Sequence, residues 1–254
     1  MMTISTPLLR AWLAAVVVSV LPAAPAVRAD STPGQDPAAA QERIAALKQS
    51  MQESQAKLRQ YEWVETTIVS LKGEEKSRKQ NRCYYGADGK LQKVPVAPPA
   101  APAAQPAAGG GRRGRGRLKE AVVENKKEEL QEYMQQAVAL VHQYVPPKPE
   151  NIDKAKAAGN VKVQPLQAGQ ARLELSNYVK PNDKMGIDLD TSANRLLAVN
   201  VASYLEEPKD TVTLAVKFGA LADGTSYTAE TTLDATAKNV HVVVQNSGHR
   251  PMQR

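Results

Sequence analysis

The alternation of apolar and polar residues is clearest in residues 211–233, where it predicts a β-hairpin. One face of the first strand carries Val212, Leu214, Val216 and Phe218, and one face of the second carries Tyr227, Ala229, Thr231 and Leu233. The pair Asp223-Gly224 lies between them, as in tight turns that join antiparallel strands. Because one face is apolar and the other polar, we expect an antiparallel sheet that is covered on one side only.

Similar alternation predicts further strands on both sides of this hairpin. They are expected at residues 62–71, 74–85, 91–96, 161–166, 171–179, 185–189, 195–205 and 240–245. Within residues 195–205, Leu197, Val199 and Val201 fall on one face. The residues from Asn246 onward are polar, and we expect them to form a loose tail.

Two segments have the helical spacing of apolar residues instead. Residues 38–59 carry a narrow stripe, and residues 118–144 carry a continuous one. The stripes consist of Ile44, Leu47, Met51, Ser54, Leu58 and Tyr61, and of Leu130, Tyr133, Met134, Ala137, Leu140, Val141 and Tyr144. The first helix either docks on its own domain or contacts a second copy of the chain. A short helix starts at Pro149 and ends at Gly159.

The N-terminal segment predicts a secretory signal peptide over residues 1–29. Arg10 precedes the apolar run 11–21, and Val27-Arg28-Ala29 offers a small-x-small cleavage site, with residues 24–26 as the alternative. The apolar run is too short to span a bilayer comfortably. We therefore expect a periplasmic or secreted protein, not an integral membrane protein, whose mature chain 30–254 is one domain.

Residues 97–117 consist almost entirely of Pro, Ala, Gly and Arg, and this composition predicts a disordered insert within the domain. Much of the excess positive charge of the chain, formally +7, is concentrated in four side chains. They are Arg112, Arg113, Arg115 and Arg117. Glycine-arginine segments that bind nucleic acid carry interleaved aromatic residues, which are absent here, so nucleic acid is not the expected partner. The remaining alternatives are an anionic envelope surface or a solvated loop without a partner.

Catalytic and metal-binding patterns are absent from the sequence. Cys83 is the only cysteine, so no intramolecular disulfide forms, and the three histidines lack metal-ligand spacing. No nucleophile elbow or phosphate-binding loop is found. Asp188 and Asp190 share one strand face, where carboxylates are usually solvated. We expect neither an enzyme nor a cofactor.

The order of these elements resembles the bacterial outer-membrane lipoprotein carriers, the LolA-like proteins. The residues that carry the resemblance are 44–58, 61–96, 118–144 and 186–245. The resemblance implies an α+β fold in which a strongly curved antiparallel sheet, an open half-barrel, is covered by amphipathic helices around an apolar cavity for acyl chains. The insert 97–117 is foreign to the carriers, and their cavity arginine has no counterpart here, so the ligand is not carried over.

An apolar sheet face under amphipathic helices is either a tightly packed core or a groove that binds lipid. The candidate groove residues are Trp63, Leu140, Tyr144, Leu197, Val199, Val212, Leu214, Val216, Phe218 and Tyr227. The first functional hypothesis is a non-enzymatic binding module for a lipid, a lipoprotein acyl chain or another amphiphile. The second is an envelope interaction protein that acts through the basic insert or the first helix, without a cavity ligand.

Overall fold

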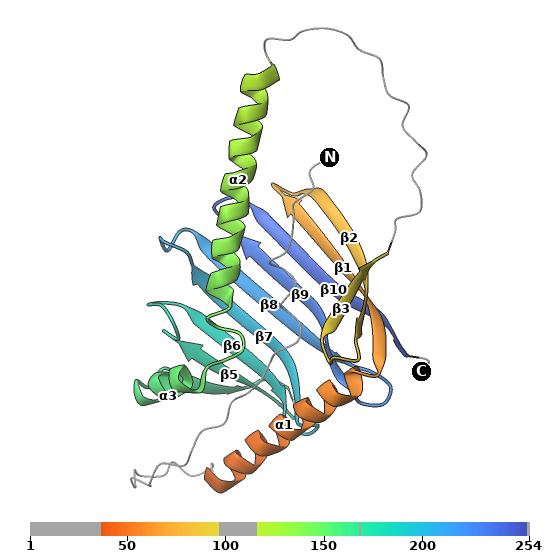
Figure 1. Cartoon of the computed structure of the whole chain (residues 1–254). Helices are drawn as coiled ribbons and strands as arrows, with labels where there is room; N and C mark the ends of the chain where they lie inside the picture. Colours follow the sequence, from red (N-terminus) through yellow and green to blue (C-terminus); the bar gives the residue numbers. More distant parts are fainter. Residues whose placement is uncertain (1–36, 97–115, 168, 253–254) are drawn as a thin grey trace.

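The computed structural model describes residues 37–96, 116–167 and 169–252, with three helices and ten strands among them (Figure 1). The helices are α1 (Pro37–Leu58), α2 (Gly116–Val141) and α3 (Pro149–Ala157). The first strands are β1 (Tyr61–Leu71), β2 (Glu74–Tyr85), β3 (Leu91–Pro95), β4 (Val161–Pro165) and β5 (Gln170–Ser176). The others are β6 (Lys184–Asp190), β7 (Arg195–Tyr204), β8 (Thr211–Ala220), β9 (Ser226–Ala235) and β10 (Val240–Pro251).

All the described strands belong to one antiparallel sheet in the order β3-β2-β1-β10-β9-β8-β7-β6-β5-β4. Two meanders are joined where β1 pairs with β10, so the sheet brings an early and a late part of the chain together. The edges β3 and β4 do not pair with each other, and the sheet stays open. The expected fold class, α+β with an open curved antiparallel sheet covered by helices, is therefore confirmed (Figure 1).

The predicted hairpin is formed by β8 and β9. Val212, Leu214 and Val216 are buried on one face, while Thr213 and Lys217 are exposed on the other. Gly224 has a φ of +81°, a conformation that costs glycine little, and its N–H donates to the Leu221 carbonyl. The alternation and the turn chemistry therefore specify this hairpin together.

The expectation of a loose tail from Asn246 is wrong, because β10 continues to Pro251. Its second half pairs with the start of β1, from Glu65 opposite Asn246 to Tyr61 opposite Pro251, with a register shift between. Gly248 has a φ of +63° in this irregular stretch. The polar sequence of this segment is typical of a loop, but its backbone hydrogen bonds to β1 hold it in the sheet.

A second difference concerns β7. A register shift between β6 and β7 places Leu189 opposite Leu196, so the alternation predicted through Leu197 is interrupted. Leu196 is buried in the core, and Leu197 is only partly buried. An additional residue in one strand changes which face the following side chains take, and the apolar pattern alone does not reveal it.

The helices take different positions around the sheet (Figure 1). Helix α2 crosses the strands over the concave face, α1 lies at one end of the strands, and α3 packs near β4 and β5. The predicted segments 38–59 and 118–144 correspond to α1 and α2 within three residues at each end. No helix in the described part of the chain combines the length and apolar character needed to cross a membrane.

Some predicted features fall on residues that the structure does not describe. The signal peptide (1–29) and most of the insert, residues 97–115, lie outside the described residues, together with Arg112, Arg113 and Arg115. Helix α2 begins at Gly116, so Arg117 belongs to its first turn and not to the insert. The anionic-surface hypothesis therefore stays a prediction.

Candidate functional site

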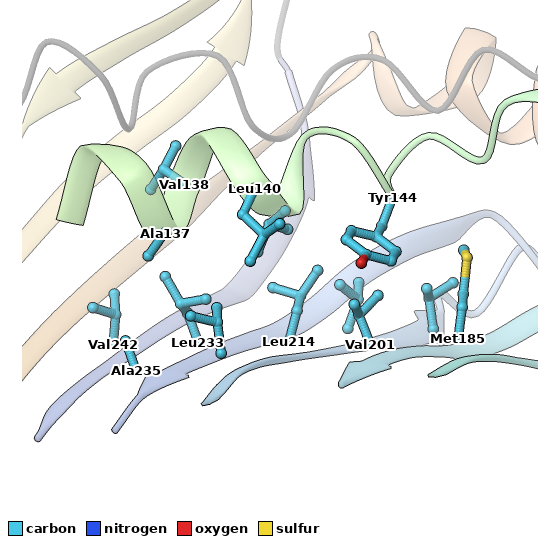
Figure 2. Close-up of a cluster of buried hydrophobic side chains, with 14 of the residues drawn as sticks. Ala137, Val138, Leu140, Tyr144, Met185, Val201, Leu214, Leu233, Ala235 and Val242 are labelled. Carbon is cyan, nitrogen blue, oxygen red and sulfur yellow. The ribbon is translucent and has the colours of Figure 1, made fainter. Parts of the chain in front are cut away.

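The C-terminal half of α2 packs its apolar face onto the concave face of the sheet. Figure 2 shows Leu140 above Leu233 and Leu214, and Tyr144 above Val201. Leu140 and Tyr144 are buried. The residues of α2 nearer its middle, Leu130 and Met134, are only partly buried. The helix is thus packed most tightly at its C-terminal end, and the contact becomes looser toward its middle.

Two tyrosines attach α2 to loops at one end of the strands. The Tyr144 hydroxyl donates to the Asp183 carboxylate at 2.5 Å and lies 2.7 Å from Ser203 Oγ. The Tyr133 hydroxyl donates to Asp210 at 2.7 Å. Burial and the Asp210 hydrogen bond raise the pKa of Tyr133 to about 12, and burial, followed by the Asp183 hydrogen bond, raises the pKa of Tyr144 as well. Both hydroxyls therefore remain protonated donors at neutral pH.

A pocket of about 50 Å³ remains between α2 and the sheet. Met134 and Val138 of α2 form one wall, and the concave faces of β1, β8, β9 and β10 form most of the rest. The strand residues that line it are Glu65, Thr67, Lys93, Leu214, Thr231, Leu233, Val242 and Val244. Most of this lining is apolar, as in sites that bind the hydrocarbon part of a ligand.

The wall of this pocket contains an ion pair between a buried carboxylate and a largely buried lysine. Lys93 Nζ of β3 lies 2.8 Å and 2.6 Å from the two carboxylate oxygens of Glu65 on β1. The Lys93 side chain is 13% exposed and that of Glu65 is 4% exposed. Burying two charges is expensive even when they are paired, so this pair is a candidate functional feature of an otherwise apolar face.

Cys83 lies beside this pair, since it is opposite Trp63 on β1 and opposite Lys93 on β3. The cysteine is fully buried. Burial, and after it the Glu65 carboxylate, raises the pKa of the Cys83 thiol to about 12. A buried, protonated thiol is a poor nucleophile, so this geometry gives Cys83 a structural role.

The predicted groove residues are distributed over three parts of the concave face. Leu214 lines the pocket, whereas Leu140 of α2 and Tyr144, three residues after the helix, are buried in the core. Val199, Val212 and Val216 are buried in the surrounding core, while Phe218 is partly buried against it. Leu197 does not join this cluster for the reason given above. Trp63 and Tyr227 lie elsewhere, at the opposite end of β1 and β10 from the loops that hold α2.

Sequence reasoning missed the polar lining of the pocket, Glu65, Thr67 and Lys93. Glu65 is in phase with Trp63 in the alternation of β1, and this places a carboxylate on the apolar side of a strand. An inward-facing charge of this kind is a signal that the sequence carries. Its partner is not visible in the sequence, because Lys93 reaches Glu65 only through the register of β1, β2 and β3.

Trp63 and Tyr227 instead belong to an aromatic cluster around His249. The His249 ring stacks on Trp63 with centroids 5.7 Å apart, and the Tyr227 ring lies 4.1 Å away. The indole N–H of Trp63 donates to the Asn246 side chain at 3.0 Å. These contacts hold the second half of β10 against β1, so the cluster stabilises the strand pairing that joins the two meanders.

The pH dependence of stability follows from the burial of His249, which lowers its pKa. Since the unfolded chain then takes up the proton first, this residue stabilises the fold above about pH 6.5 and its contribution is lost as the pH falls through the folded pKa. We expect His249→Phe, which keeps an aromatic ring, to flatten the loss of stability below about pH 6.5. Urea unfolding of both proteins across this range measures the difference, and parallel pH profiles would contradict it.

The outer face of the sheet has a broader hollow of about 330 Å³, lined by small and charged residues. Its lining includes the small residues Gly186, Ala202 and Ala215 and the basic residues Arg172 and Lys184. Asp188 is held by Arg172 in a two-bond ion pair at 2.6 Å and 2.7 Å, while Asp190 caps the turn after β6. Among the described residues no group of three or more His, Cys, Asp and Glu side chains could hold a metal ion.

Comparisons with known proteins give similarity in structure only. No family model and no curated protein sequence matches the chain. A DUF1329 family protein from Desulfovibrio piger aligns with a TM-score of 0.37 at 10% identity, over 82% of this chain and 92% of the other. A LolA superfamily protein from Nitrosomonas europaea aligns with a TM-score of 0.31 at 10% identity, over 80% and 94%.

Proposed function

We propose that this protein is a non-enzymatic binding module of the bacterial cell envelope that takes up the apolar part of a lipid or another amphiphile. The ligand site is the pocket between α2 and the concave face of the sheet. The N-terminal sequence supports a periplasmic or secreted location. The observation that carries the proposal is an apolar pocket under an amphipathic helix that also holds a largely buried ion pair, Glu65 and Lys93.

The size of the pocket defines what ligand entry requires. An apolar cavity of about 150 Å³ holds a molecule of the size of benzene, so about 50 Å³ is far too small for an acyl chain. A chain must therefore displace α2 side chains from the sheet. Met134 and Leu130 are only partly buried, and methionine adapts readily to a changed shape. The C-terminal end of α2 stays in place through Tyr144, while separation of its middle from the sheet also breaks the hydrogen bond from Tyr133 to Asp210.

The direct test is native mass spectrometry of the mature protein purified from a host with a bacterial envelope, followed by extraction into organic solvent. A bound lipid or acylated molecule supports the proposal and identifies the ligand chemistry. A protein mass without ligand, together with no uptake of added fatty acid, monoacylglycerol or phospholipid, would contradict the proposal. It would indicate that the concave face is only part of a packed core.

A matched pair of substitutions on β9 tests the location of the site. Thr231 lines the pocket, and Thr232 lies on the opposite face because side chains alternate along a strand. We expect Thr231→Leu to fill the pocket, to leave the free energy of unfolding unchanged or raised by up to about 1 kcal/mol, and to weaken lipid binding about tenfold. Thr232→Leu should bind like the wild type, as measured by displacement of an uncharged hydrophobic fluorophore. Equal binding by the two variants would move the site elsewhere.

A further inference from the structure

The ion pair in the pocket wall limits the kind of polar end group that a bound ligand can have. This inference rests on the proposed function. Lys93 uses two of its three N–H donors on the two carboxylate oxygens of Glu65. The third donor remains for a ligand atom in the pocket, which Lys93 lines together with Glu65. A hydrogen-bond acceptor on the ligand would satisfy it.

The charge of the pair limits this acceptor. Glu65 neutralises Lys93 at hydrogen-bond distance, so the polar wall of the pocket has no net charge. A ligand carboxylate bound beside the pair would add a second anion near Glu65 and leave one buried negative charge uncompensated. Buried charges without a partner are strongly unfavourable. An uncharged carbonyl oxygen accepts the same hydrogen bond without this penalty.

We propose that Lys93 and Glu65 are specificity-determining residues that select amphiphiles with an uncharged polar end, such as an acyl ester, over amphiphiles that end in a carboxylate. Lys93 donates the hydrogen bond to the ligand. Glu65 does not contact the acceptor in this scheme, but its charge sets the preference. The apolar pocket residues, including Leu214 and Val244, face the hydrocarbon part of the ligand.

The test compares dodecanoic acid with its glycerol monoester, at mildly alkaline pH where the acid is ionised. Each ligand displaces an uncharged fluorophore from the wild-type protein, below the concentration at which the ligand forms micelles. We expect the monoester to bind about tenfold more tightly or better. As the pH falls into the range where the carboxyl group is protonated, binding of the acid should strengthen, while binding of the monoester should stay constant.

Substitution of Glu65 gives a result that a merely structural role would not produce. In Glu65→Gln the Lys93 cation is no longer neutralised, so the order of affinities should reverse in favour of the acid. Where this variant is too unstable to test, the pH dependence in the wild-type protein decides. Tighter or equal binding of the ionised acid by the wild type, or an unchanged order in the folded variant, overturns the inference and leaves the proposed function intact. Failure of both ligands to bind overturns the proposed function itself.

Discussion

Replacement of Asp183 by alanine is expected to destabilise the protein by about 3–5 kcal/mol. Asp183 is almost fully buried, and its carboxylate accepts backbone N–H groups of Tyr178, Val179 and Lys180 at 2.6–2.8 Å. It also accepts the Tyr144 hydroxyl that fixes the end of α2. Alanine leaves all four donors without this acceptor in a buried loop. Urea unfolding measures the loss, and the midpoint of thermal unfolding should fall by about 10 °C.

Two further variants separate this effect from a general effect of removing a carboxylate. Asp153 lies exposed on α3, and Asp153→Ala should change the free energy of unfolding by no more than about 0.5 kcal/mol. Asp183→Asn keeps one acceptor oxygen and should fall between the wild type and the alanine variant. A loss below about 1 kcal/mol in Asp183→Ala would show that water replaces the carboxylate and that Asp183 does not anchor α2.

The elements that local sequence specifies were predicted well. The β8–β9 hairpin combines alternating residues with an Asp-Gly turn, and β1, β2 and β3 begin and end within one residue of the predicted ranges. Helix α2 follows from its apolar stripe, since a 3.6-residue period distinguishes it from the neighbouring strands. Each of these signals lies within a single segment, so no knowledge of distant contacts was needed.

The errors have a common physical origin in contacts between distant segments. The second half of β10 is polar, and it becomes a strand because Trp63, 183 positions before Asn246, bonds to it. The core position at Leu196 depends on a register shift against β6. Asp183 belongs to a Pro-Asn-Asp sequence that indicates only a turn, and its role requires the end of α2. Of the ten predicted groove residues, Leu214 alone is among those that line the pocket, because the position of α2 over the sheet also depends on contacts between distant segments.

The ion pair between Glu65 and Lys93 supplies the second large effect. Lys93→Met leaves the Glu65 carboxylate buried without its cation, and we expect a loss of about 3–5 kcal/mol in the free energy of unfolding. The double variant Glu65→Met/Lys93→Met buries two apolar side chains of suitable length. It should be as stable as the wild type or more stable by about 1–4 kcal/mol. Chemical unfolding of the wild type, Glu65→Met, Lys93→Met and the double variant gives the coupling energy of the pair in a double-mutant cycle.

The exposed pair Lys217–Glu230 on the outer face of β8 and β9 is the matched control, at 2.9 Å. Lys217→Met should cost no more than about 1 kcal/mol, because both charges remain solvated. If the double variant at Glu65 and Lys93 is stable, folding does not require the charges. Their retention in the pocket wall then needs another reason, and selection of the polar end of a ligand supplies one. If the double variant instead loses as much as Lys93→Met alone, the two side chains are needed for packing, and the case for a binding role weakens.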